Sequence, residues 1–388
     1  MIPYGRQDIN QSDIDAVVAV LRSDWLTQGP VAPQFEDAVA RYTGAAYGVA
    51  VNSATSALHI ACLALGVGPG DWVWTSSNTF VASANCALYC GAQVDFVDID
   101  PLTYNMSETI LEAKLESAEK MGCLPKVVIP VHFAGQPCKM DQIHRLRAKY
   151  GFRVLEDASH AIGALYDEKK IGSCYGSDIA VFSFHPVKII TTGEGGMAMT
   201  NDPGLAEKMA RLRTHGVTTD RGLMQSRPHS EIWNYQQIEL GYNYRMTDIE
   251  AALGLSQLTE LDEFVRRRRE IAARYDRELA DLPITLPWQA PGTRSSYHLY
   301  PICVKRNESG LGQRSLYDEL RDSGILANLH YIPVHRQPFF EQLGFTPGYC
   351  LNAEEYFRTS LSIPLFSGLS DIQQSTIIER LRSLLGRA

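Results

Sequence analysis

A lysine at the end of an apolar run is the residue in this sequence with the clearest chemical use. Lys188 closes the segment Phe182-Ser183-Phe184-His185-Pro186-Val187-Lys188, and a glycine-rich stretch follows at residues 193–196. A strand that ends in this way places the amine at the edge of a sheet, where burial lowers its pKa and makes it a nucleophile that forms imines. The glycines allow the backbone to approach a ligand closely. An isolated lysine more often extends into solvent, so the other signals decide its role.

An acidic pair follows another apolar run. Glu156 and Asp157 come directly after an expected strand at residues 152–155, in the segment Glu156-Asp157-Ala158-Ser159-His160. A carboxylate at the carboxyl end of a strand lies where α/β sheets bind ligands. A unit charge pair about 4 Å apart is worth about 4 kcal/mol at an effective dielectric of about 20, which corresponds to roughly three pKa units. Asp157 could therefore keep a pyridine-type nitrogen protonated near neutral pH, and capping of the next helix is its alternative role.

Two further segments offer places for a phosphate and for a flat ring. Asn52-Ser53-Ala54-Thr55-Ser56-Ala57 joins an expected strand to an expected helix, and hydroxyls with free backbone N–H groups at a helix N-terminus bind phosphate. Phe80 stands at the start of the next expected helix, where it could stack on a flat cofactor. An ordinary helix cap explains the first segment as well, and a core position explains the second.

Other patterns argue against competing chemistries. Gly66-Val67-Gly68-Pro69-Gly70 follows an expected helix and precedes an expected strand, whereas the dinucleotide fingerprint has the opposite order and a further glycine. We therefore expect no nicotinamide site. The run at residues 266–269 consists of arginines within a helical pattern. It is interpreted as a solvated helix face, with a contact to a diphosphate as the less favoured alternative. His, Asp and Glu show no spacing typical of metal ligands, so no metal is expected.

The composition excludes several classes of protein. The 388 residues carry a formal charge of 36 − 44 = −8, which disfavours nucleic acid as a partner. The longest apolar stretch, residues 57–68, is shorter than the roughly 20 residues that cross a membrane, and the N-terminus lacks the pattern of a secretion signal. The eight cysteines are scattered and are interpreted as free thiols of a reducing compartment. We expect a soluble cytoplasmic protein without a nucleic-acid or membrane partner.

Alternating strands and helices must position the candidate residues. Short apolar runs predict strands at residues 47–52, 71–75, 92–97, 126–133, 152–155, 178–184 and 197–200. Helical patterns between them cover residues 53–65, 78–89, 108–119 and 140–150. Strands separated by helices indicate βαβ units, and hence an α/β fold with a mostly parallel sheet.

The pattern changes at Thr247, which opens a capping sequence with Glu250. A helical pattern without proline then continues to Asp281, which predicts one long helix joining two domains. The rest of the chain predicts a smaller α+β domain, with strands at residues 298–304 and 325–332 and helices at residues 314–323 and 371–385. We expect a large domain at residues 13–250, followed by the linking helix and the small domain at residues 251–388.

The ordered set of motifs resembles the DegT/DnrJ/EryC1/StrS family of sugar aminotransferases, which are fold-type I enzymes that use pyridoxal phosphate. The resemblance covers essentially the whole chain. The phosphate turn, the aromatic residue, Glu-Asp, Ser-Phe-His-x-x-Lys and Gly-Tyr-Asn-Tyr-Arg occur in the order and approximate spacing of the family. The resemblance implies a seven-stranded, mostly parallel sheet, an N-terminal segment (residues 1–12) near the active site, and an obligate homodimer.

The resemblance also implies a role for each matching residue. Lys188 would form a Schiff base with pyridoxal phosphate and later move a proton between cofactor and substrate. Asp157 would pair with the ring nitrogen and make the ring an electron sink. His160, where many relatives carry Gln, would hydrogen-bond the phenolic oxygen, and Phe80 would stack on the ring. The phosphate would be held by Ala54, Thr55, Ser56 and Ser183, together with Asn243 of the neighbouring subunit.

His160 and His185 together resemble the subset of the family that aminates C4 of UDP-linked 4-keto sugars, above all the members that act in pseudaminic acid biosynthesis. This implies transfer of an amino group from L-glutamate to UDP-2-acetamido-2,6-dideoxy-β-L-arabino-hexos-4-ulose. Substrate contacts would come from Tyr4, Asp24, Trp25, Leu26, Thr27, His185, Asn328, Leu329, His330 and Tyr331. A different keto sugar, such as a 4-keto-arabinose or a 3-keto sugar, is the nearest alternative. An alternative from another class is a non-catalytic sugar or cofactor sensor on the same fold.

Overall fold

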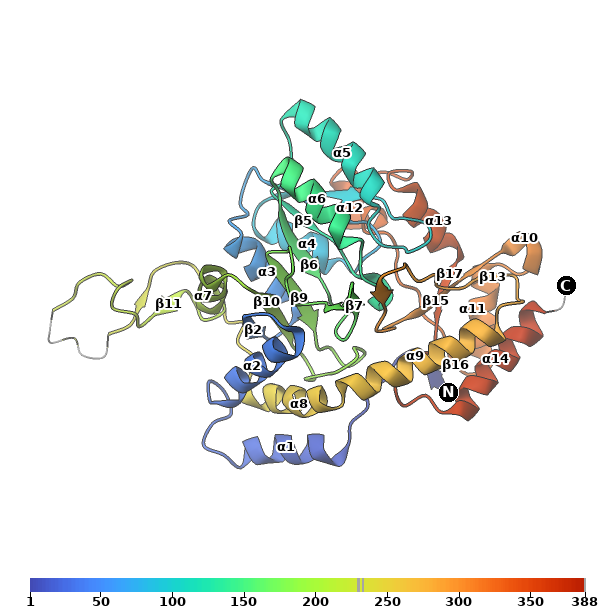
Figure 1. Ribbon diagram of the computed structural model, residues 1–388, viewed down its shortest axis with the longest axis horizontal. Coiled ribbons are helices and arrows are strands. Elements are labelled where there is room, and N and C mark those ends of the chain that lie inside the picture. The colour runs from blue at the N-terminus through green and yellow to red at the C-terminus, as the bar shows by residue number, and fades with distance from the viewer. Residues whose placement is uncertain (229–230, 232–233, 387–388) are drawn as a thin grey trace.

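A seven-stranded sheet forms the centre of the computed structural model, which describes residues 1–228, 231 and 234–386 (Figure 1). The strands lie in the order β2-β10-β9-β6-β5-β3-β4. Strand β10 is antiparallel to both of its neighbours, and all other pairs are parallel. The predicted seven-stranded, mostly parallel sheet is therefore confirmed. The bounds are β2 (Tyr47–Val51), β3 (Trp72–Ser76), β4 (Gln93–Val97), β5 (Val127–Ile129), β6 (Arg153–Asp157), β9 (Ile179–Ser183) and β10 (Gly196–Thr200).

Helices cover both faces of this sheet. One face packs against α3 (Ala54–Ala64), α4 (Ala82–Tyr89) and α7 (Pro203–Leu212). The other face packs against α2 (Val31–Thr43), α5 (Glu108–Met121), α6 (Met140–Tyr150) and α8 (Asp248–Thr259). Because both faces are covered, central strands such as β9 and β10 are largely apolar. Every residue of β9 and β10 is buried.

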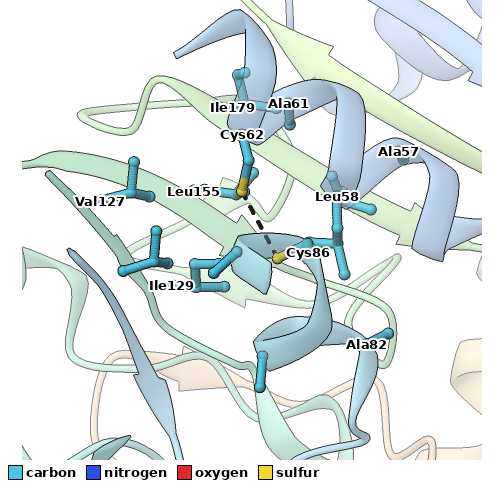
Figure 2. Packing of buried hydrophobic residues seen from close by; sticks show 14 of the residues in the cluster. Ala57, Leu58, Ala61, Cys62, Ala82, Cys86, Val127, Ile129, Leu155 and Ile179 are labelled. Carbon is cyan, nitrogen blue, oxygen red and sulfur yellow. Dashed lines mark hydrogen bonds between the residues drawn. The ribbon is translucent and has the colours of Figure 1, made fainter. Parts of the chain in front are cut away.

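Small side chains bring α3 and α4 close to the sheet. Figure 2 shows Ala57 and Leu58 of α3 among residues from several strands, including Val127 and Ile129. Cys62 of α3 and Cys86 of α4 face each other, with their Sγ atoms 3.7 Å apart. The eight cysteines are free thiols and six of them are buried, so most of them act as small core residues, as expected.

The C-terminal part of the chain has its own sheet and core. Strands β13 (Ile284–Thr285), β15 (Tyr300–Val304) and β17 (Ser360–Ile363) form an antiparallel sheet. The core around it includes residues from α9 (Leu261–Glu278), α11 (Gln313–Asp322) and α14 (Asp371–Leu385). The N-terminal strand β1 (Ile2–Pro3) pairs in parallel with β16 (Ile325–Leu326), which ties the start of the chain to this part.

The remaining elements are short or peripheral. A second small sheet contains β7, β8 and β14, and β11 pairs with β12 in the segment that projects from the body of the molecule near α7 (Figure 1). Their bounds are α1 (Gln11–Leu21), β7 (Leu165–Tyr166), β8 (Lys169–Lys170), β11 (Val217–Thr218), β12 (Gln236–Gln237), β14 (Thr293–Arg294), α10 (Arg306–Ser309), α12 (Pro338–Gln342) and α13 (Leu351–Thr359), with 3-10 turns at Phe133–Gly135 and Val334–Arg336.

The single long helix predicted from Thr247 to Asp281 is wrong. The capping box of Thr247 and Glu250 is present, but α8 ends at Thr259 and α9 begins at Leu261. Glu260 separates them with φ −96° and ψ −4°. The hydroxyl of Thr259 donates to the carbonyl of Ser256, and such back-bonding favours a bend. The break has a packing reason: α8 lies against α1 and α2, whereas the later turns of α9 join the C-terminal core.

Three other predicted elements are shorter than the sequence indicated. The helix expected from Asn78 begins only at Ala82, so Phe80 lies in the loop before α4. The strand expected to reach Phe133 ends before Pro130, which has no N–H for a sheet hydrogen bond. The strand expected at residues 325–332 ends at Leu326, and the following residues form an irregular segment joined to Ser362 by a single bridge.

No helix among the described residues has both the length and the apolar character needed to span a membrane.

Candidate active site

A cavity of about 750 Å³ lies at the carboxyl ends of β6 and β9. Asp157 ends β6 and Ser183 ends β9, and both line the cavity. The first turn of α3 forms another part of the wall, and residues 328–331 of the C-terminal part and Tyr4 complete it. The ends of parallel strands meet at one sheet edge, which explains how segments distant in sequence reach one site.

Lys188 lies in the loop between β9 and β10 and lines this cavity. Its backbone N–H donates to the carbonyl of His185 at 2.8 Å, which closes a turn after β9. Burial lowers the pKa of the Lys188 amine to about 8, and the negative charge of Asp157 opposes this shift only in part. A lysine with such a pKa supplies the neutral amine that attack on a carbonyl requires.

The Lys188 amine is expected to titrate near pH 8 in the cofactor-free protein, rather than near 10.5. Because burial disfavours the ammonium form, the neutral amine predominates above this pH and is lost as the pH falls below it. Reductive ¹³C-methylation followed by an NMR titration measures the midpoint. The Lys188→Arg variant identifies the signal by its absence, and a midpoint near pH 10 would contradict the expectation.

Asp157 accepts one hydrogen bond from α4 and one from the loop that follows β6. The Ser83 hydroxyl donates to Oδ2 at 2.6 Å, and the Ser159 N–H donates to Oδ1 at 3.0 Å. The side chain is 5% exposed. These donors fix the direction of the carboxyl group, so Asp157 can present it to a ligand in the cavity.

Glu156 belongs to a buried network on the opposite face of β6, because side chains alternate along a strand. The Cys138 N–H donates to Nδ1 of His132 at 3.0 Å. Since a backbone N–H can only donate, the ring proton of His132 is on Nε2, which donates to Glu156 at 2.7 Å. Burial raises the pKa of Glu156, but the hydrogen bonds from His132 and Ser177 outweigh it and keep the pKa below its ordinary value.

Replacing His132 with leucine is expected to destabilise the fold by about 3 kcal/mol, because the buried Glu156 carboxylate loses a donor. The carboxyl then takes up a proton in the folded protein, and its pKa rises above the unfolded value of about 4.3. Stability is therefore lost as the pH rises through the folded pKa, and the effect is larger at about pH 8 than at about pH 5. Urea denaturation at both pH values measures this.

The matched control breaks an exposed pair. Arg314 donates to Asp318 at 2.8 Å on the surface of α11, and the Asp318→Ala change should cost less than about 1 kcal/mol. A cost below about 1 kcal/mol for His132→Leu as well would contradict the assigned role of the buried network.

The first turn of α3 offers free donors to the cavity. Ser53 is the N-cap and accepts a hydrogen bond from the Ser56 N–H at 3.1 Å. Among the described residues, the N–H groups of Ala54 and Thr55 have no acceptor in the fold. A Cβ at position 196 would lie 2.5 Å from the Ala54 nitrogen, so Gly196 lets this turn lie directly against β10. The arrangement is typical of an anion cradle.

His160 is buried at the wall of the cavity, between the loop after β6 and the C-terminal part. Its Nδ1 is 3.3 Å from the Ala134 nitrogen, and its Nε2 is 3.1 Å from the Tyr331 hydroxyl. Its ring centroid is 4.3 Å from that of His298. Burial, together with the charge of Lys188, holds the pKa of His160 well below its ordinary value, so the imidazole is neutral.

Most residues predicted from the sequence line this one cavity. They are Tyr4, Ala54, Thr55, Ser56, Phe80, Asp157, His160, Ser183, His185, Lys188, Asn328, Leu329, His330 and Tyr331. The remaining predicted residues do not line this cavity; they are Asp24, Trp25, Leu26, Thr27 and Asn243. Trp25 is 57% exposed. The sequence did not indicate three further residues that line the cavity, which are Ser159, Glu194 and His298. It also did not indicate Ser83, which does not line the cavity but donates a hydrogen bond to Asp157.

Comparison with known proteins places this site in a family. The chain matches the model of the DegT/DnrJ/EryC1/StrS aminotransferase family over residues 7–382. The chain belongs to this family. It is 38% identical to the spore coat polysaccharide biosynthesis protein SpsC of Bacillus subtilis, covering 99% of this chain and 97% of that protein. It is 39% identical to a UDP-4-amino-4,6-dideoxy-N-acetyl-beta-L-altrosamine transaminase of Campylobacter jejuni. This match covers 94% of this chain and 92% of that protein.

A solved structure agrees over the full length. The Helicobacter pylori aminotransferase PseC, described as involved in the biosynthesis of pseudoaminic acid, superposes with a TM-score of 0.90 at 31% identity and covers 100% of both chains. The fold-type I architecture and the assignment as an aminotransferase are thereby confirmed. Pyridoxal phosphate is the cofactor of the aminotransferases in this DegT/DnrJ/EryC1/StrS family.

The cavity of this family member fits that cofactor on chemical grounds. A pyridoxal phosphate has an aldehyde, a basic ring nitrogen and a phosphate, and the cavity offers a depressed-pKa amine at Lys188, a fixed carboxylate at Asp157 and an anion cradle at the start of α3. The exposed ring of Phe80, 59% accessible, is free to cover a flat ligand. Within the described residues, no cluster of three or more His, Cys, Asp or Glu has the geometry of a metal site.

Proposed function

We propose that this aminotransferase transfers the amino group of L-glutamate to C4 of UDP-2-acetamido-2,6-dideoxy-β-L-arabino-hexos-4-ulose and forms UDP-4-amino-4,6-dideoxy-N-acetyl-β-L-altrosamine. The observation that carries the chemistry is that the Lys188 amine and the Asp157 carboxylate line one cavity beside an anion cradle. The sugar is supported by the name of the Campylobacter jejuni relative and by the likeness to PseC.

Each residue of the site has a part in this proposal. Bound pyridoxal phosphate supplies an electron sink for the carbon that gains or loses the amino group. Lys188 would bind the cofactor covalently and would carry the proton at the reacting carbon. Asp157 holds a proton on the ring nitrogen, and Phe80 covers one ring face. Ala54, Thr55, Ser56 and Ser183 bind the phosphate.

The sugar is assigned to the same cavity. Tyr4, His185 and the segment Asn328–Tyr331 line it from three separate parts of the chain. The His330 ring lies 5.2 Å from that of Tyr4, and its Nδ1 is 2.9 Å from the Ser362 hydroxyl. These rings offer apolar faces and polar edges, which is the combination that sugar rings and amides require.

A second copy of this chain is needed to complete the site. The lining of the cavity includes one lysine and no arginine among the described residues, whereas a UDP-sugar carries two phosphates. We assign Asn243 and the segment Asp24–Thr27 to the site of the neighbouring subunit, in a homodimer. In one subunit, the backbone of Asn243 is bridged to Thr214, near the start of the projecting segment.

Mixing two damaged subunits tests this arrangement. Lys188→Ala inactivates its own site, and Asn243→Ala weakens the phosphate contact in the neighbouring site. When the two variants are mixed in equal amounts, about half of the dimers contain one subunit of each kind, and each of these dimers has one intact site out of two. Roughly a quarter of native activity should therefore return. The individual variants provide the baseline. No gain on mixing, with exchange of subunits verified by mass spectrometry, would contradict the assignment of Asn243.

The reaction itself is tested with the purified enzyme and a panel of keto sugars. Addition of glutamate should remove the absorbance band of the bound cofactor, and addition of the proposed 4-keto sugar should restore it. The panel includes a UDP-4-keto-arabinose and a 3-keto sugar, because the similarity to SpsC also allows a sugar of another polysaccharide. Failure to aminate the altrosamine precursor would reject the proposed substrate, and a permanently unchanged band would favour the sensor alternative.

A further inference from the structure

Both ring nitrogens of His160 are engaged by groups of the protein. The Ala134 nitrogen lies 3.3 Å from Nδ1, and the Tyr331 hydroxyl lies 3.1 Å from Nε2. The ring is 6% exposed. Ala134 has φ 57° and ψ 4°, a left-handed conformation that is uncommon for alanine and that is retained only where the surroundings require it.

The partner of Nδ1 determines where the ring proton lies. A backbone N–H can only donate, so Nδ1 must accept and cannot carry a proton. The imidazole is neutral, since burial and the charge of Lys188 disfavour its protonated form. The single ring proton is therefore on Nε2, and Nε2–H donates to the oxygen of Tyr331.

This direction leaves the hydrogen of the Tyr331 hydroxyl for another acceptor. In the part of the chain that is described, the bond with His160 is the one hydrogen bond of this hydroxyl. The Tyr331 N–H, by contrast, donates to Oδ1 of Asn78 at 3.3 Å, which helps to fix the backbone. Tyr331 lines the cavity together with Lys188 and Asp157, so its free O–H is available to a ligand there.

We propose that Tyr331 donates a hydrogen bond to the phenolic oxygen of the bound cofactor, and that His160 is a positioning residue that orients the Tyr331 hydroxyl. The inference rests on the proposed function in one respect, which is that the cofactor ring lies between Lys188 and Asp157. It reassigns the expectation from the sequence, in which His160 itself contacted that oxygen, because the only N–H of His160 is already used.

The charges around Tyr331 are compatible with this role. Burial raises the pKa of Tyr331, and the charge of Asp157 and the neighbouring Tyr4 raise it further, so the hydroxyl keeps its proton. His330 is the residue before Tyr331. Burial and the charge of Lys188 lower its pKa to about 3, so it is neutral. Among the described residues, the charge that acts on this hydroxyl is therefore that of Asp157, and the neighbouring imidazoles of His160 and His330 are neutral.

The first test uses the absorbance of the cofactor-loaded enzyme without any substrate. The Tyr331→Phe change keeps the aromatic ring and removes the hydrogen-bond donor, which leaves the anionic phenolic oxygen of the cofactor less stabilised. The protonated form of the bound cofactor should therefore persist to higher pH. The pH midpoint of the absorbance change should rise by about one pH unit, because a hydrogen bond to a charged acceptor is worth one to two such units. An unchanged midpoint would overturn the proposal.

Variants of His160 separate positioning from direct contact. Glutamine has an acceptor oxygen and a donor NH₂ group on its amide and can replace both hydrogen bonds, so His160→Gln should keep the native midpoint. His160→Leu should raise the midpoint, and combining it with Tyr331→Phe should add nothing to the Tyr331→Phe value, because His160 acts through Tyr331. An additive double variant, or an effect of His160→Leu without one of Tyr331→Phe, would show that His160 contacts the cofactor directly.

The tautomer is tested without reference to the reaction. In ¹⁵N-histidine-labelled protein, the two resonances that disappear in His160→Gln should show an unprotonated Nδ1 and a protonated Nε2. The opposite tautomer would overturn the proposal. The absorbance and NMR experiments both omit the sugar, so a wrong assignment of the sugar would not affect their results. Absence of the cofactor absorbance band would instead reject the attachment of the cofactor to Lys188.

Discussion

The Lys188→Ala enzyme is expected to lose transamination by about 10⁴-fold or more, because one substitution removes both the covalent attachment of the cofactor and the group that moves the proton. The same variant should lack the absorbance band of the attached cofactor. Both losses follow from an amine whose pKa is lowered to about 8 by burial and which lines the cavity with Asp157. Steady-state assays with glutamate and the keto sugar, together with spectra of the purified variant, measure them.

Two controls distinguish loss of the amine from loss of the fold. Lys188→Arg keeps a positive charge but provides no neutral amine, so it should be as inactive as the alanine variant. Lys169→Ala, on the exposed strand β8, should retain native activity. Thermal unfolding of all three variants checks that each one is folded. Native activity in a folded Lys188→Ala enzyme would defeat the assignment of the site.

The Asp157→Asn enzyme is expected to show the second largest effect, a fall in kcat of roughly 10³-fold. An amide preserves the shape but removes the charge that keeps the ring nitrogen protonated, and such a charge pair is worth about 4 kcal/mol, or three factors of ten. The cofactor should still be attached through Lys188, so its absorbance band remains. Rapid-mixing measurements of the glutamate half-reaction give the rate directly.

Ser83→Ala is the matched variant, because it keeps the carboxylate and removes the donor at 2.6 Å. The loss of one hydrogen bond to a charged group should reduce the rate by about 10-fold. If Asp157→Asn lowered kcat no more than Ser83→Ala does, the carboxylate would serve only to shape the site, and its pairing with the ring nitrogen would be contradicted.

The fold could be predicted from the sequence wherever the local residue pattern matches the tertiary packing of the element. Strands such as β9 are largely apolar because helices cover both faces of the sheet, and apolar runs of this kind are visible in the sequence. The break at Glu260 was not visible, since α8 and α9 form one continuous helical pattern. What separates them is that each helix packs against different partners, and no single window of sequence contains that information.

Site residues at the ends of strands could be predicted from the sequence. Site residues that only tertiary packing brings to the cavity were missed. Lys188 and Asp157 follow apolar runs, so their place at the sheet edge follows from the pattern. Ser83 lies within α4 as an ordinary small residue, and its bond to Asp157 joins elements 74 positions apart. His298 reaches the cavity from the C-terminal part, and nothing in its own segment indicates this.

The direction of the hydrogen bond between His160 and Tyr331 shows a further limit of sequence reasoning. The family resemblance assigned His160 to the cofactor site, and the structure places it in the cavity wall, but its use of both nitrogens depends on the backbone of Ala134. A similar limit applies to Asn243 and Asp24–Thr27, which do not line this cavity and which we propose to act in the site of a second subunit.

Reduction of the loaded enzyme with borohydride, followed by peptide mass mapping, tests most directly whether the coenzyme is bound where this account places it. Borohydride converts the bond between the aldehyde carbon and an amine into a stable secondary amine, which marks the attached lysine. The peptide containing Lys188 is expected to carry the reduced pyridoxyl phosphate, and the Lys188→Ala protein is expected to carry none. A label on a different lysine, or an unlabelled Lys188 in a fully loaded enzyme, would contradict it.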